Sequence, residues 1–75
     1  MIKTNDWIKS STSNHGDQIS YTLRGGWWMS YTKSLGEISV RAPDGRFSIL
    51  DPDEPVTSAI VAKRLAADHV NRNDY

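Results

Sequence analysis

The sequence predicts an α+β fold, an antiparallel four-stranded meander sheet with one C-terminal helix packed on one face. Two patterns lead to this prediction. Between Gln18 and Leu50, apolar and polar residues alternate in short runs separated by turn residues, as in strands with one buried face. After Pro55 the alternation gives way to an alanine-rich segment, which favours a helix. We therefore expect a single domain, residues 1–75, whose helix covers the apolar face of the sheet.

The composition excludes several classes of protein. The 75 residues include no cysteine, so no disulfide or thiolate site supports the fold, and this favours a reducing compartment. Nine Lys and Arg residues balance nine Asp and Glu residues, so no overall field attracts nucleic acid or a membrane surface. The first residues lack the apolar stretch of a signal peptide, and no run is long enough to span a membrane. These features predict a cytoplasmic protein without a membrane partner.

Residues 1–17 are expected to be an N-terminal segment and a loop. Residues 4–9 fit either a short capped helical turn or an extra edge strand, with Trp7 and Ile8 as a hydrophobic anchor. The polar run from Ser10 to Asp17 is typical of a loop. The sheet is therefore expected to occupy residues 18–50.

The first turn of this sheet decides which of two neighbouring tryptophans is buried. Successive strand residues point to opposite faces, so Trp27 and Trp28 cannot both enter one core. A three-residue loop, residues 24–26, pairs Leu23 with Trp27 and keeps the following apolar residues on the inner face. Its last position requires a left-handed backbone, which Gly26 provides. The sequence therefore predicts Trp27 inside and Trp28 outside.

The two later turns are each expected to be four-residue loops, residues 33–36 and 42–45. The second loop would pair Arg41 with Arg46, and Phe47 would then enter the core. The expected inner face consists of Ile19, Tyr21, Leu23, Trp27, Met29, Tyr31, Ile38, Val40, Phe47 and Ile49.

The helix is expected over residues 55–71, with Pro55 at its first position and acidic residues near its positive end. Val61 and Leu65 lie opposite the side of the helix that should face the sheet. Either Trp7 and Ile8 cover them, or they form a self-association surface and the protein is a homodimer. The side expected to face the sheet is made of Val56, Ile60, Ala67 and Val70.

The predicted register assembles a candidate binding surface on the outer face. Trp28, Arg41 and Arg46 would form one row across three strands, with Arg24 at the nearby turn. Two interpretations remain open. The arginines can merely stack over Trp28 on a solvated polar face, or this surface can bind a partner, since Trp and Arg are enriched at binding hot spots. A sheet face can contact a protein or enter a DNA groove.

The sequence offers little support for catalysis. His15 and His69 lie far apart and lack a metal-binding spacing, so no metal site is expected. Gly25 and Gly26 precede a strand rather than a helix, which indicates a hairpin turn rather than a phosphate loop. The serines lack a nucleophile-elbow context. We therefore expect a protein that is not an enzyme and needs no cofactor.

Two stretches carry a resemblance to phage proteins. The run "GDQISYTLRGGWW", followed by Ala62-x-Arg64-Leu65-Ala66, resembles short proteins of lambdoid phage early regions. The size, the neutral charge and the sheet-plus-helix plan are also similar to anti-CRISPR and other host-takeover proteins. These resemblances imply a non-enzymatic accessory or inhibitor protein in the bacterial cytoplasm. Its partner would be a host macromolecule, in the first place a protein such as a defence, replication or transcription component.

A third resemblance implies the alternative function. Three strands followed by a helix resemble the arm-type domains of phage integrases, which place their sheet in the major groove of DNA. The chain would then be a DNA-binding module, with three or four arginine and lysine residues of the sheet in that role. The two functions differ in their salt dependence, because neutralising phosphates makes DNA binding weaken steeply as salt is added.

Overall fold

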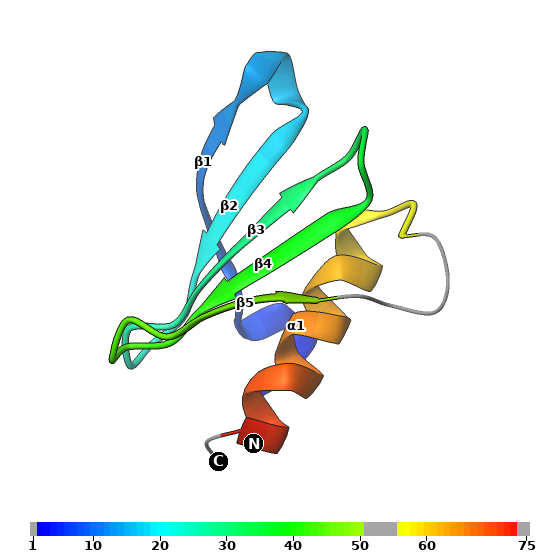
Figure 1. The fold of residues 1–75 in the computed structure, drawn as a ribbon. Helices are drawn as coiled ribbons and strands as arrows, with labels where there is room; N and C mark the ends of the chain where they lie inside the picture. Colours follow the sequence, from blue (N-terminus) through cyan, green and yellow to red (C-terminus); the bar gives the residue numbers. More distant parts are fainter. Residues whose placement is uncertain (1, 51–55, 74–75) are drawn as a thin grey trace.

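The computed structural model describes residues 2–50 and 56–73, and it shows an α+β fold (Figure 1). One antiparallel sheet has the strand order β1-β2-β3-β4-β5, and helix α1 lies on one of its faces. Two short 3-10 turns, Thr4–Asp6 and Asn14–Gly16, flank the first strand. The elements are β1 (Ile8–Ser13), β2 (Gln18–Thr22), β3 (Trp28–Thr32), β4 (Glu37–Arg41), β5 (Phe47–Leu50) and α1 (Ala59–Asn73).

The sheet has five strands, so the prediction of four strands is wrong. The additional strand, β1, includes part of the serine-rich run that was expected to be a loop. It pairs with β2 through a bulge between Lys9 and Ser11, and the Ser10 hydroxyl donates a hydrogen bond to the Ser20 carbonyl oxygen at 3.1 Å. All six residues of β1 are exposed, so this strand has no apolar alternation by which it could be recognised.

The first turn confirms the prediction for the two tryptophans. The Leu23 backbone N–H donates to the Trp27 carbonyl oxygen at 3.0 Å, which closes a three-residue loop, and Gly26 has a φ of 95°. Trp27 is only 3% exposed, whereas Trp28 is half-buried on the opposite face. The four-residue loop between β3 and β4 is also confirmed, because Thr32 pairs with Glu37.

The last turn is one residue shorter than predicted. The side chains of β5 therefore lie on the opposite faces of the sheet from those predicted. Arg41 pairs with Phe47 rather than with Arg46. The Ala42 backbone N–H donates to the Arg46 carbonyl oxygen at 2.8 Å, so the loop contains the three residues 43–45. A shift of one residue turns every side chain of a strand to the other face. Phe47 and Ile49 therefore lie on the outer face, with exposures of 57% and 59%, and are not part of the core.

This turn has the same geometry as the first one. In both turns the carbonyl oxygen of the residue before the loop accepts a hydrogen bond from the N–H of the last loop residue. This residue is a glycine with φ above 90°, Gly26 in the first turn and Gly45 in the last. Asp44 strengthens the last turn, because its Oδ1 accepts the Arg46 backbone N–H at 3.0 Å. The two loops also touch, since a Cβ added at Gly26 would lie 3.2 Å from the Cβ of Pro43.

Helix α1 begins later than predicted. Val56 and Thr57 are not helical, Ser58 caps the helix with its Oγ 3.3 Å from the Val61 backbone nitrogen, and the predicted start at Pro55 lies outside the described residues. The helix is buried mainly through small side chains and packs over β3 and β4. Ile60 is 68% exposed, so the predicted side of the helix was wrong at this residue. The buried helix residues are Ala62, Ala66, Ala67 and Val70.

The N-terminal segment completes the core. Trp7 is only 4% exposed. The backbone of Ile2 forms two hydrogen bonds with the Asn71 side chain, at 2.9 Å and 3.0 Å, which connect the start of the chain to the end of α1. Val61 and Leu65 are partly buried and pack against the core, so they form only a limited free surface.

Candidate binding surface on the outer face of the sheet

A row of paired residues crosses the outer face of the sheet. It runs through all five strands, and its β3, β4 and β5 members are Trp28, Arg41 and Phe47. The guanidinium carbon of Arg41 lies 5.3 Å from the centre of a Trp28 ring, within the range of a cation–π contact. Ile49 lies on the same face, in the neighbouring row. We call Trp28, Arg41, Phe47 and Ile49 the outer patch.

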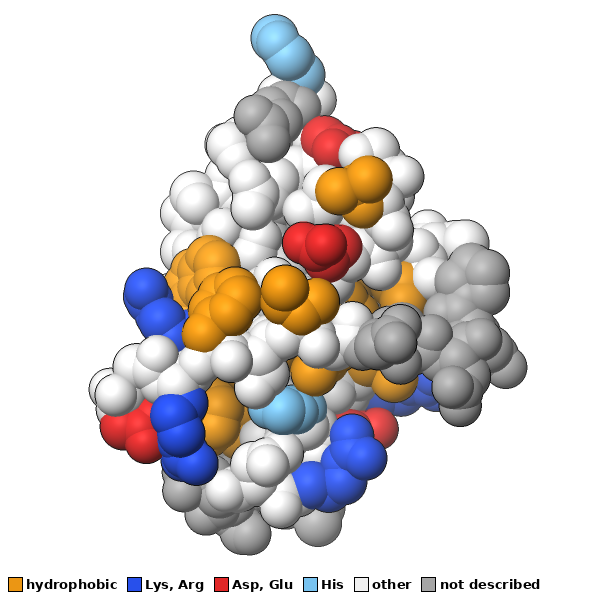
Figure 2. All heavy atoms as spheres, viewed as in Figure 1, with side chains coloured by type: hydrophobic (Ala, Val, Ile, Leu, Met, Phe, Trp, Pro, Cys, Tyr) orange, Lys and Arg blue, Asp and Glu red, His pale blue; other side chains and the backbone are white. Residues whose placement is uncertain are grey.

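The outer patch leaves apolar surface open to solvent. Phe47 and Ile49 each expose more than half of their side chains, and no described element covers them. Figure 2 shows hydrophobic side chains gathered over this part of the sheet, with a basic side chain beside them. Large apolar side chains that cluster at a surface are typical of binding sites, whereas single ones are common everywhere.

Hydroxyl side chains occupy most of the other outward positions of β2, β3 and β4. Ser20, Ser30 and Ser39 occupy paired positions in β2, β3 and β4, and the Gln18 side-chain amide donates to the Ser30 hydroxyl at 2.9 Å. Ser30 is only 3% exposed, so neighbouring side chains, including that of Gln18, cover it. The outer face therefore has an aromatic and arginine end and a hydroxyl end.

The structure brings together two of the four predicted partner-binding residues. Trp28 and Arg41 are neighbours in one row, as predicted, and their side chains are in contact. Arg24 is exposed in the β2–β3 loop, where it borders a hollow together with Ile8. Arg46 is not part of the row, because the register of β5 turns it to the inner face. Its Nε lies 2.7 Å from Oδ2 of Asp44.

Sequence reasoning missed the two β5 residues of the outer patch, Phe47 and Ile49. A signal for them was present. The last turn, Pro43-Asp44-Gly45, repeats the three-residue pattern of the first turn, with glycine at its third position. Applying the three-residue loop to both turns would have placed Phe47 opposite Arg41.

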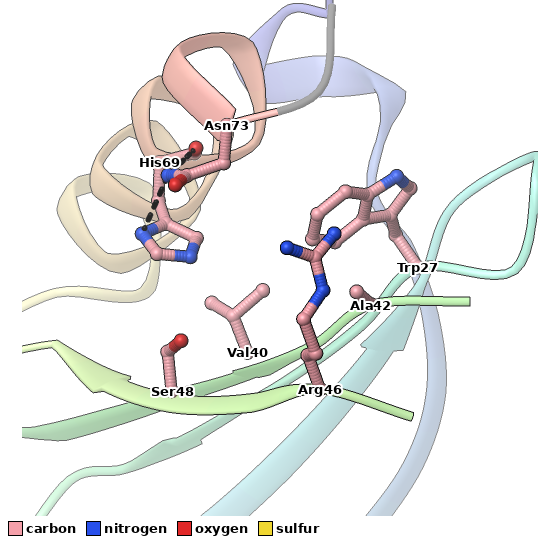
Figure 3. Close-up of a pocket in the computed structure, with 7 residues that line it drawn as sticks. All are labelled: Trp27, Val40, Ala42, Arg46, Ser48, His69 and Asn73. Atoms are coloured by element: carbon pink, nitrogen blue, oxygen red, sulfur yellow. Dashed lines mark hydrogen bonds between the residues drawn. The ribbon is translucent and has the colours of Figure 1, made fainter. Parts of the chain in front are cut away.

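A second hollow lies on the inner face, between β5 and the end of α1 (Figure 3). Arg46 and Ser48 border it from the strand side, and His69 and Asn73 border it from the helix. Burial, with a smaller effect from the nearby Arg72, lowers the pKa of His69 from its ordinary value of 6.5. On the strand side, the hydrogen bond from the Arg46 backbone N–H lowers the pKa of the exposed Asp44. The hollow combines a neutral imidazole with an arginine that is already paired.

The described residues contain no group of three His, Cys, Asp or Glu side chains that could hold a metal ion. His15 lies in the turn between β1 and β2 with a φ of 57°, and His69 lies in α1, so the two histidines belong to separate parts of the fold.

None of the helices in the described part of the chain has both the length and the apolar character needed to cross a membrane.

Comparison with protein families, with characterised proteins and with solved structures finds no match for this chain. The function must therefore be inferred from the surface itself.

Proposed function

We propose that this chain is a non-enzymatic binding protein whose outer patch contacts a partner protein. The resemblance to small phage accessory proteins makes a protein of the bacterial host the expected partner. One observation carries the proposal: the exposed Phe47 and Ile49 lie on the same sheet face as the half-buried Trp28, next to an arginine.

The residue types of the outer patch fit a protein interface. Trp and Arg are enriched among the residues whose truncation costs most binding energy, and such residues lie centrally among contacts that contribute less. Here Trp28 lies in the middle strand of the sheet with Arg41 beside it, and Ser30 and Ser39 occupy the neighbouring row. Neighbouring strands hold the patch, so little conformational entropy is lost on binding.

The charge distribution favours protein over DNA as the partner. On β2 to β5, the outward positions hold one basic residue, Arg41, and one acidic residue, Glu37. Arg46, one of the basic residues expected on this face, is turned to the other side and paired with Asp44. A DNA-binding face draws most of its affinity from several phosphate contacts, and a single arginine provides few.

Affinity capture from bacterial lysate tests the proposal. The immobilised full chain, its Trp28→Ala/Phe47→Ala variant and a Ser39→Ala control are each exposed to lysate with and without nuclease. Hot-spot truncations cost at least about 2 kcal/mol, which corresponds to roughly thirtyfold in affinity. We therefore expect a protein that the parent and the control retain and that the double variant loses.

Two results would contradict the proposal. One is capture of the same proteins by the double variant and by the parent. The other is capture that disappears with nuclease and weakens steeply with added salt, because that behaviour is expected of a nucleic-acid partner. Thermal unfolding of each variant shows whether a lost interaction merely reflects a lost fold.

A further inference from the structure

The free edge of β5 presents unpaired backbone groups in a defined order. The Ala42 N–H donates to the Arg46 carbonyl oxygen at 2.8 Å, so Arg46 directs its carbonyl towards β4. In an antiparallel ladder, successive residues alternate between groups that face the neighbouring strand and groups that face away from it. Ser48 and Leu50 therefore bond to β4, whereas the N–H and C=O groups of Phe47 and Ile49 point outward from the sheet.

The two edges of the sheet differ in their protection. The β1 edge has a bulge next to Lys9 and a run of hydroxyl residues, features that discourage pairing with another strand. The β5 edge pairs with β4 in regular register and contains no charge, no proline and no bulge. No other described strand lies beside β5, as its position at the margin of the sheet in Figure 1 shows. An edge of this kind is a template for an additional strand.

We propose that a second copy of this chain pairs with β5, antiparallel and about a two-fold axis. Phe47 of each copy lies opposite Ile49 of the other, and the two Ser48 residues meet at the axis. Each Phe47 and Ile49 pair exchanges two backbone hydrogen bonds, so the contact has four. This proposal is independent of the proposed function, because it uses the backbone groups of β5 and leaves Trp28 and Arg41 of the outer patch uncovered.

Three features favour this occupant. The register places outer-face side chains opposite outer-face side chains, so the apolar strip continues across both copies. A register centred on Phe47 would instead require the Gly45 N–H, which already bonds to the Ala42 carbonyl oxygen at 3.0 Å. The formal net charge is zero, so two copies do not repel each other.

The geometry also indicates how strong the contact is. Helix α1 lies mainly over β3 and β4. With strands about 4.8 Å apart, the two helices of the dimer would be separated by about 14 Å or more. Packed helices lie 8–10 Å apart, so Val61 and Leu65 do not meet across the axis. The strands alone bury less than the roughly 800 Å² per partner of a stable interface, and we expect a dimer that depends on concentration.

The test combines sedimentation velocity with amide hydrogen exchange of the full chain, from micromolar to millimolar concentration. Ile49→Pro removes an outward N–H without removing a β4–β5 hydrogen bond, and Ile49→Ala removes the side chain but retains the N–H. We expect the parent and Ile49→Ala to dimerise as concentration rises, and Ile49→Pro to remain monomeric. In the parent, exchange at Phe47 and Ile49 should slow in proportion to the dimer fraction, with no change at Ser48 and Leu50.

Three results would overturn the proposal. The first is a parent protein that remains monomeric at every concentration. The second is an Ile49→Pro variant that dimerises as the parent does. The third is a dimer in which amide hydrogen exchange at Phe47 and Ile49 does not slow. That result would assign the contact to another surface, such as the Val61 and Leu65 side of α1. Because the exchange measurement uses the parent protein, it decides the matter even where Ile49→Pro does not fold.

Discussion

The two faces of the sheet use the same kinds of side chain for different purposes. On the inner face Trp27, Met29 and Ile38 are almost completely enclosed by the sheet and by the small residues of α1. On the outer face Ile49 is 59% exposed and Trp28 is half-buried beside Arg41, and no described helix or strand packs over them. Trp27 and Trp28 are neighbours in sequence, so their difference comes only from the alternation of side chains along a strand. Hydrophobicity alone therefore does not identify the core of this protein.

The two tryptophans provide the largest expected contrast in stability. Trp27→Ala removes a nearly buried indole, so we expect the free energy of unfolding to fall by about 3–5 kcal/mol. Trp28→Ala should leave the fold largely intact, because its indole is half-buried on the outer face. Urea unfolding followed by circular dichroism measures both. Equal losses would mean that the two faces are not distinct.

Ile38 and Ile49 sharpen the comparison at the strand whose predicted register was wrong. Ile38 is fully buried, and Ile38→Ala should cost about 2–5 kcal/mol. Ile49 is 59% exposed, and Ile49→Ala should change the stability of the monomer by no more than about 0.5 kcal/mol. The same urea titration at low protein concentration measures both. A large cost at Ile49 would support the register in which Ile38 and Ile49 face each other in the core.

His69 provides the smallest contrast, which appears as a dependence on pH. Burial and Arg72 lower its pKa in the folded protein, so the unfolded chain binds this proton more readily. The stability that neutral His69 contributes is complete above about pH 6.5 and is lost as the pH falls through the lowered pKa. Thermal unfolding between pH 7.5 and 5.5 should show a decline for the parent and a smaller one for His69→Gln. Parallel curves would mean that the inner hollow does not perturb His69.

Local patterns were sufficient for much of the fold and for the positions of two of the four residues predicted to bind a partner. The alternation from Gln18 to Val40 and the paired glycines of the first turn predicted the Trp27 and Trp28 faces, because side-chain parity and loop length together determine register. The neighbouring positions of Trp28 and Arg41 on the outer face were predicted for the same reason. Arg46 was misplaced because a single loop residue was counted wrongly, and Phe47 and Ile49 were lost with it.

The sequence by itself determined the antiparallel sheet, the presence of the C-terminal helix and the tryptophan that enters the core, since these depend on periodicity and turn chemistry. Only the tertiary structure decided that a run of serines becomes strand β1, because that strand is held by backbone bonds to β2 rather than by buried side chains. It also decided which side of α1 is buried. The small residues Ala62 and Ala66 are completely buried in the core, whereas the bulkier Ile60 is 68% exposed. Packing against a particular neighbour overrides hydrophobicity there, and no local pattern contains that neighbour.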